Sequence, residues 1–214
     1  MDRTTGLVLL FTIIIPLVAL AIALYAHAKA RSPETQRLLS DRDLLELIQG
    51  QPDQLLTPHQ LRDASELTLT QARGRLSDLF MYGILTRSYN SKGRYFYGLS
   101  DPLSKQPDLE LSPEPFLTVE DLLALFDTYG NQITAQEMIV ATGLPLAIIK
   151  RELKHFEKEG IVQVLKRSQG QGMTTRRFIV LKEPYRSNPE QFRQKAGVLD
   201  LELKEILRND NLLV

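Results

Sequence analysis

Eight basic side chains in the second half of the chain are spaced so that they could neutralise the phosphates of a nucleic acid. Four fall on one predicted helical face, opposite the apolar positions Ile149, Leu153 and Phe156. The other four lie on two flanking segments predicted to pair as a hairpin. Each phosphate that a cation neutralises releases counterions and adds to affinity. We therefore expect contacts with double-stranded DNA from Arg151, Lys154, His155, Lys158, Lys166, Arg167, Arg176 and Arg177.

A plainer alternative stays open for this basic face. Its cations are interleaved in sequence with Glu152, Glu157 and Glu159, as on the solvated side of any exposed helix. Residues 116 to 182 contain nine Lys and Arg against seven Asp and Glu, and the whole chain has 26 of each class. Net charge therefore favours no partner, and the argument for DNA depends on where the charges lie.

The matching helix in the first half has a different outward face, with Asp78 and no cation at its centre. Arg73 lies at the flank of this face, and Lys92 and Arg94 lie in the hairpin that follows. These three residues add phosphate contacts only at the margin. Residues 40 to 100 contain seven basic and seven acidic side chains. We expect this half to pack on a partner or on the matching second half of the chain.

Catalytic and metal-binding patterns are not found in the sequence. There is no cysteine, which excludes disulfides, thiolate metal sites and cysteine nucleophiles. His27, His59 and His155 lie in separate segments without metal-ligand spacing, and the pair Gly170 and Gly172 lacks the Lys-Ser/Thr of a phosphate-binding loop. The sequence therefore predicts no enzyme, no cofactor and no metal site.

The elements that position the basic residues occur twice, at a constant offset. Thr57, Leu76 and Gly83 correspond to Thr134, Leu153 and Gly160, so that 134 − 57, 153 − 76 and 160 − 83 are all 77. Each copy predicts a first helix, a threonine-capped second helix, a third helix ending before glycine, and a hairpin. In the second copy the third helix runs from 146 to 158. Its hairpin pairs 161 to 167 with 176 to 182.

This order resembles the winged helix-turn-helix superfamily. The resemblance rests on the Leu-x-x-Leu/Phe-x-x-x-Gly-Ile end of each third helix and on the hairpin directly after it. It covers residues 40 to 100 and 116 to 182, most of the chain beyond its first 30 residues. The resemblance implies that a third helix enters the major groove while the hairpin, or wing, lies against the backbone. It also admits members that use the same surface to bind proteins.

The N-terminal residues are unlike the rest. Residues 6 to 26 are 21 consecutive residues without a charge, and as a helix they would span about 31 Å, close to the roughly 30 Å of a bilayer core. Arg3 precedes this segment, whereas Lys29, Arg31 and Arg37 follow it. This bias predicts a single-pass protein of the cell membrane with its C-terminal bulk in the cytoplasm. A cleaved signal peptide is the alternative, suggested by the small residues Ala26 and Ala28.

The predicted fold class is α+β, mainly α, with one transmembrane helix followed by tandem winged-helix domains. The predicted parts are an anchor at 1 to 30, a tether at 31 to 39, a first winged helix at 40 to 100, a proline-rich linker at 101 to 115, a second winged helix at 116 to 182, and an extension at 183 to 214 with a helix near 198 to 208.

The predicted function is that of a membrane-anchored DNA-binding protein, a transcription regulator, whose main contact is the third helix and wing of the second copy. The alternative is an interaction scaffold that binds proteins through both copies and does not bind DNA. A protein partner, or a second copy of the chain, would then contact the first winged helix or the C-terminal helix.

Overall fold

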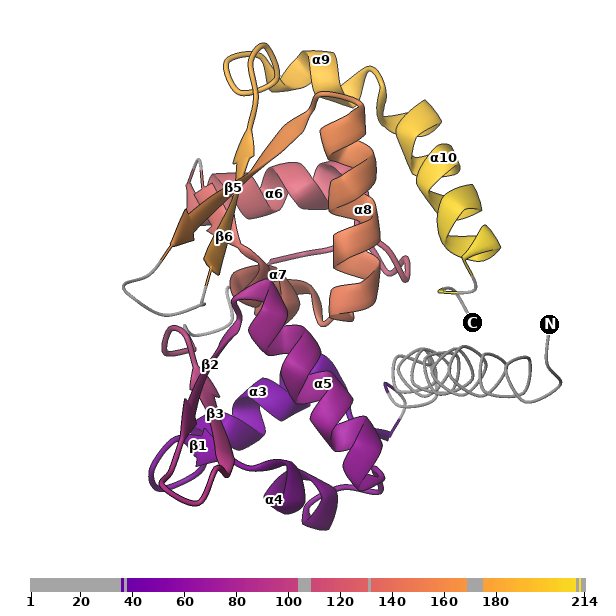
Figure 1. Ribbon diagram of the computed structural model, residues 1–214. Helices are drawn as coiled ribbons and strands as arrows, with labels where there is room; N and C mark the ends of the chain where they lie inside the picture. Colours follow the sequence, from indigo (N-terminus) through magenta and orange to yellow (C-terminus); the bar gives the residue numbers. More distant parts are fainter. Residues whose placement is uncertain are drawn as a thin grey trace, which may run out of the picture.

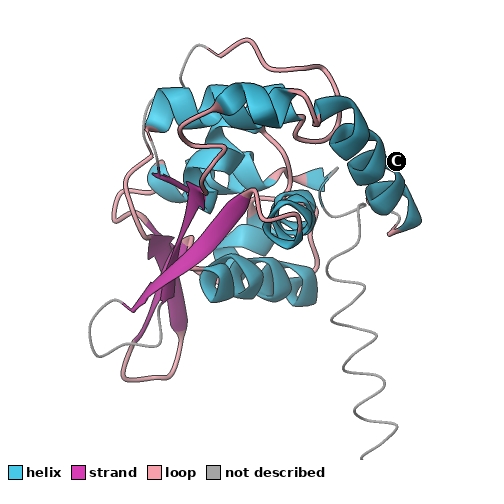
Figure 2. Cartoon of the chain, turned by 90° about the horizontal axis from the view of Figure 1, so that it is seen from above, coloured by secondary structure: helices cyan, strands magenta, loops and turns pink. Residues whose placement is uncertain are grey.

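The computed structural model describes residues 36, 38–103, 109–130, 132–168, 175–210 and 212. Within these residues the chain is an α+β protein with two three-stranded antiparallel sheets. The two halves are stacked, with the first half below the second in Figure 1. The strands of both halves gather on one side of the molecule and the helices on the other (Figure 2).

The first half contains three helices and one sheet. The order along the chain is α3 (Asp41–Gln49), β1 (Leu55–Leu56), α4 (Pro58–Asp63), α5 (Leu69–Tyr82), β2 (Leu85–Tyr89) and β3 (Tyr95–Leu99). The predicted helices and hairpin are confirmed. The sheet has the order β1-β3-β2, so it gains a strand that the sequence did not predict. Two residues are too short a run to produce an alternating pattern.

The second half repeats this order and then continues. Its elements are α6 (Val119–Tyr129), β4 (Gln132–Thr134), α7 (Ala135–Thr142), α8 (Leu146–Lys158), β5 (Val162–Ser168) and β6 (Thr175–Leu181), followed by α9 (Pro189–Arg193) and α10 (Ala196–Asn209). The sheet order β4-β6-β5 matches that of the first half. The short strand β4 was again missed, and α8 has the bounds that its sequence predicted.

Local side chains fix where most of these helices begin. Five of them start at a serine or threonine whose side chain accepts a hydrogen bond from a backbone amide of the first turn, as N-caps do. These N-caps are Ser40, Thr57, Thr68, Thr118 and Thr134. Helix α8 differs, because Pro145 occupies its N-cap position and makes no side-chain cap.

The missing cap of α8 is supplied by Asp41, a residue of the first half. Asp41 Oδ2 accepts a hydrogen bond from Leu146 N at 2.8 Å. Asp41 Oδ1 lies 2.5 Å from Arg75 Nη2 of α5, and both side chains are buried. The carboxylate therefore joins α3, α5 and the positive end of α8, and it ties the second half to the first.

Two further contacts bring the halves close together. Gly83 ends α5 with a φ of 85°, and a Cβ at this position would lie 2.2 Å from the Thr175 carbonyl oxygen. Nearby, Gln136 Nε2 donates to Asp101 O at 2.8 Å. The role of Gly83 as a helix C-cap, expected from the sequence, is confirmed. The structure adds that β6 packs directly against this turn.

The C-terminal helix α10 folds back onto the second half, where it packs on α6 and α8 (Figure 1). Leu199, Leu203 and Leu207 are buried along one side of it, and the helix predicted near 198 to 208 is confirmed. Asp200 Oδ1 accepts a hydrogen bond from Val119 N at 3.0 Å, at the first residue of α6. This contact gives α10 a fixed position within the same chain.

No helix in the described part of the chain has both the length and the apolar character needed to cross a membrane. This finding corrects the transmembrane helix of the predicted fold class and the predicted single-pass location in the cell membrane. The longest described helices, α5 and α10, have 14 residues each, or about 21 Å, less than the roughly 30 Å of a bilayer core. Residues 6 to 26, on which the prediction was based, lie outside the described residues.

One carboxyl group in the core has an altered ionisation. Glu152 of α8 has no exposed surface, and its Oε1 accepts a hydrogen bond from Leu117 N at 2.7 Å. Burial raises the pKa of Glu152 from 4.5 to about 8, opposed by the Leu117 amide and reinforced by the charge of Asp121. Below the raised pKa, Glu152 is therefore neutral in the folded protein.

We expect Asp41→Asn to lower the free energy of unfolding by about 3 to 5 kcal/mol, because it leaves the Arg75 guanidinium buried without its counter-charge. Denaturant titration measures this loss. Asp63→Asn is the matched control, since Asp63 pairs with Arg62 at the surface and should cost less than about 1 kcal/mol. Equal, small losses in both variants would contradict the role of Asp41.

We expect the stability of the wild-type protein to fall as the pH rises from about 5 to about 8. In this range the folded state keeps the Glu152 proton, whereas the unfolded state, with a pKa near 4.5, has lost it. The stabilisation is complete below the unfolded pKa and is lost as the pH passes through the folded one. Glu152→Gln keeps an acceptor for the Leu117 amide and should flatten this slope in denaturation curves, whereas Glu66→Gln at an exposed position should not.

Candidate nucleic-acid interface

The lysines of α8 form a stripe on the side of the helix that faces solvent. Leu153 and Phe156 are buried on the inner side, whereas Lys150, Lys154 and Lys158 are exposed. Residues four apart on a helix lie above one another, so the three ammonium groups share one surface. Lys154 and Lys158 are among the contacts predicted from the sequence, and Lys150, which was not predicted, follows the same interval of four residues.

The acidic residues in and directly after α8 lie beneath the lysine stripe or at its edges. Glu152 is in the core. Glu157 Oε1 accepts a hydrogen bond from Val164 N of the hairpin at 3.2 Å, and Glu159 lies beside His155 on the side of α10. The interleaving of signs along the sequence therefore becomes, on the helix, a basic stripe with the acids at its edges or beneath it.

Helix α10 covers one side of the basic face predicted for α8. Arg151 forms an ion pair with Asp210, just beyond the end of α10. His155 is 7% exposed, and its Nε2 lies 3.5 Å from Glu202 Oε2. Two of the four predicted contacts on α8 are thus engaged by the C-terminal helix. The sequence predicted a helix near 198 to 208, but no local pattern located the surface that it covers.

The β5–β6 hairpin divides the four predicted wing residues into two pairs. Lys166 and Arg167 of β5 are exposed, on the hairpin that follows α8. Arg176 Nη2 pairs with Asp101 at 2.6 Å. Arg177 Nη1 donates to Met81 O at 3.0 Å, and its guanidinium lies over the Tyr82 ring, 4.2 Å from the centroid. Arg176 and Arg177 therefore each contact the first half.

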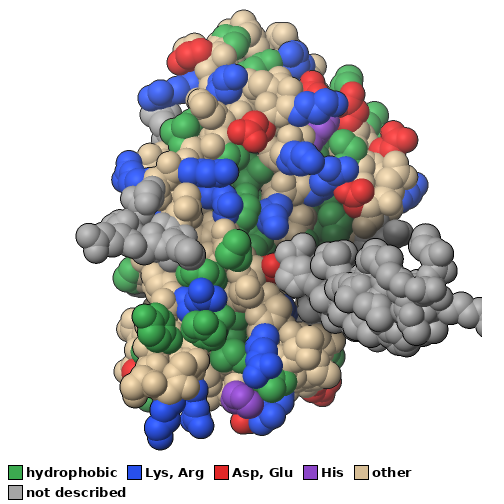
Figure 3. Space-filling view, viewed as in Figure 1, with side chains coloured by type: hydrophobic (Ala, Val, Ile, Leu, Met, Phe, Trp, Pro, Cys, Tyr) green, Lys and Arg blue, Asp and Glu red, His purple; other side chains and the backbone are tan. Residues whose placement is uncertain are grey.

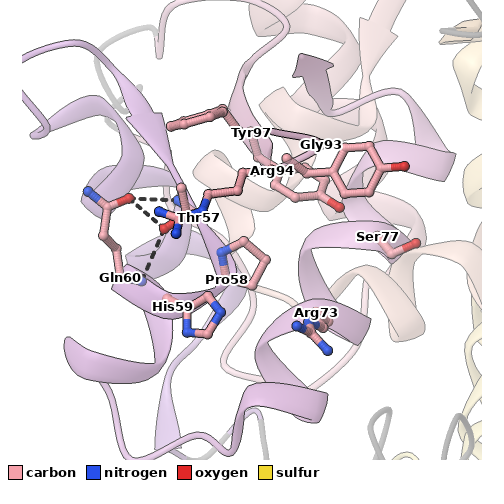
Figure 4. A pocket seen from close by; sticks show the side chains of 11 residues that line it. Thr57, Pro58, His59, Gln60, Arg73, Ser77, Gly93, Arg94 and Tyr97 are labelled. Carbon is pink, nitrogen blue, oxygen red and sulfur yellow. Dashed lines mark hydrogen bonds between the residues drawn. The ribbon is translucent and has the colours of Figure 1, made fainter. Parts of the chain in front are cut away.

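The corresponding surface of the first half is open. Arg73, Lys92 and Arg94 are exposed, and a groove of about 900 Å³ opens between α4, α5 and β3. Arg73 projects from α5 and Arg94 from the hairpin, with the first turn of α4 between them (Figure 4). The capping box of Thr57 and Gln60 fixes that turn. The groove also has aromatic and aliphatic walls, which include Pro58, Tyr95 and Phe96.

Both surfaces lie on the same side of the molecule. In Figure 1, α5 and α8 run along the front of the two halves with their hairpins to the same side. Lys and Arg side chains gather over α8 and the β5–β6 hairpin on this face (Figure 3). A single extended ligand could therefore contact both halves.

The side chains of this face that could bind an anion are lysines and arginines. Contacts between distant parts of the chain also assemble His155, Glu159 and Glu202, whose potential metal-ligating atoms lie within 4.8 Å of one another. Histidine spacing in the sequence predicted no metal site. Two of the three side chains in this cluster are carboxylates, which that spacing does not detect. No family model, curated protein or solved structure matches this chain.

Proposed function

We propose that the chain is a tandem winged helix-turn-helix protein that binds double-stranded DNA, with α8 and the β5–β6 hairpin as its main contact. The order of helix, short strand, two helices and hairpin supports this assignment in both halves. The observation that carries the proposal is the exposed stripe of Lys150, Lys154 and Lys158 on α8, with Lys166 and Arg167 exposed on the hairpin that follows. Regulation of transcription is the use that we propose for this binding.

The dimensions of the surface fit a duplex. A helix with its side chains is about 10 to 12 Å across, which matches the roughly 12 Å width of the major groove. Lys150 and Lys158 are eight residues, or about 12 Å, apart along α8. Because α10 covers the side of α8 that carries His155, DNA would approach from the hairpin side. Lys166 and Arg167 lie on that side and would contact the backbone as a wing does.

A second candidate function is supported by the groove of the first half. Its aromatic and proline walls are suited to a protein segment, while Arg73 and Arg94 at its rim also suit a phosphate backbone. In this alternative the tandem winged helices act as an interaction scaffold. The two functions differ in salt dependence, since contacts with phosphates weaken steeply as salt is added.

We expect Lys154→Gln with Lys158→Gln to weaken binding of duplex DNA by the full-length chain roughly 10- to 100-fold near 0.1 M salt. The slope of log K against log salt should fall by about two, one for each phosphate that is no longer neutralised. Fluorescence anisotropy with a labelled duplex over a salt series measures both quantities.

Arg42→Gln with Arg193→Gln is the control, because it removes the same charge from arginines already paired with Glu46 and Glu120. Its affinity for DNA should stay near that of the wild type. If the wild-type chain does not bind duplex DNA at low salt, the DNA-binding function is wrong and the scaffold function remains.

A further inference from the structure

An unsatisfied imidazole nitrogen lies between α8 and α10. His155 is 7% exposed, and its Nε2 is fully buried without a hydrogen-bond partner among the described residues. A buried polar atom in this state costs free energy unless something binds it. The nearest acidic atom, Glu202 Oε2, is 3.5 Å away, too far for a normal hydrogen bond.

A metal ion bound by both atoms would account for the distance between them. Two ligands bound to one Zn²⁺ ion at about 2.0 to 2.1 Å in tetrahedral geometry are separated by about 3.4 Å. His155 Nε2 and Glu202 Oε2 are 3.5 Å apart. They are therefore spaced as neighbouring ligands of one ion.

A third ligand comes from the next turn of α8. Glu159 is four residues after His155, the interval that places two side chains on the same side of a helix. Its carboxylate and the other two ligating atoms all lie within 4.8 Å of one another. Glu159 and Glu202 are exposed, so an ion can enter from solvent and keep water in its remaining position.

We propose that His155, Glu159 and Glu202 form a binding site for a divalent transition-metal ion of the Zn²⁺ class. One imidazole and two carboxylates are ligands that zinc accepts, and the lack of thiolates favours reversible binding over a permanent structural site. The ion joins α8 to α10 and supplies the partner that His155 Nε2 lacks. This inference does not depend on DNA binding.

The site is tested with the full-length chain and zinc chloride, by titration calorimetry and by the unfolding temperature. We expect one ion per chain and an unfolding temperature that rises with zinc concentration, as for any ligand of the folded state. Co²⁺ in place of Zn²⁺ should give the visible absorption of a four-coordinate site.

Glu159→Gln and Glu202→Gln should each weaken zinc binding at least 10-fold, and both change exposed side chains. Glu205→Gln, an exposed acid of α10 outside the cluster, is the matched control and should bind zinc like the wild type. Lack of saturable zinc binding by the wild type would overturn the proposal. So would unchanged binding by both ligand variants, which would place the ion elsewhere.

Discussion

The Asp41 carboxylate is the interaction on which the arrangement of the two halves depends. It is buried at the start of α3, pairs with Arg75 of α5 and caps Leu146 at the start of α8. Since Pro145 leaves α8 without a cap of its own, the helix that carries the lysine stripe is oriented by the other half of the chain. A fixed α8 keeps the lysine stripe and the groove of the first half on one face, which independent domains on a linker would not do.

Short sequence patterns predicted the helices and strands, whereas contacts between distant residues determine which side chains remain exposed on each surface. The caps Thr57 and Thr134 and the glycine at 83 act over three or four residues, so the pattern was sufficient. Arg177, in contrast, was assigned to DNA because it is basic and lies on a strand. Its guanidinium contacts Met81 O, 96 residues away, and no local pattern records a partner at that distance. His155 was misplaced on solvent for the same reason.

The two copies differ in which third helix is covered, and this difference is not the one that their charges predicted. Charge alone favoured the second copy as the DNA contact and the first as a packing surface. In the structure it is the second copy that is partly covered, because α10 packs on its α8. The groove beside Arg73 in the first copy is open. The charge evidence for the second copy is now limited to the lysine stripe of α8. Lys154 is exposed there, and the acidic residues lie at the edges of the stripe or beneath it.

Helix α10 also limits how this surface can be used. It places Asp210 against Arg151 and Glu202 near His155, so two acidic side chains lie close to the basic face. In the proposed DNA complex, those acids would repel a phosphate backbone while Lys158 and Lys166 would attract it, which would direct it toward the hairpin side of α8. Zinc at Glu159 and Glu202 would offset two of the negative charges. The carboxylates that α10 places near α8 therefore also set the charge beside the lysine stripe.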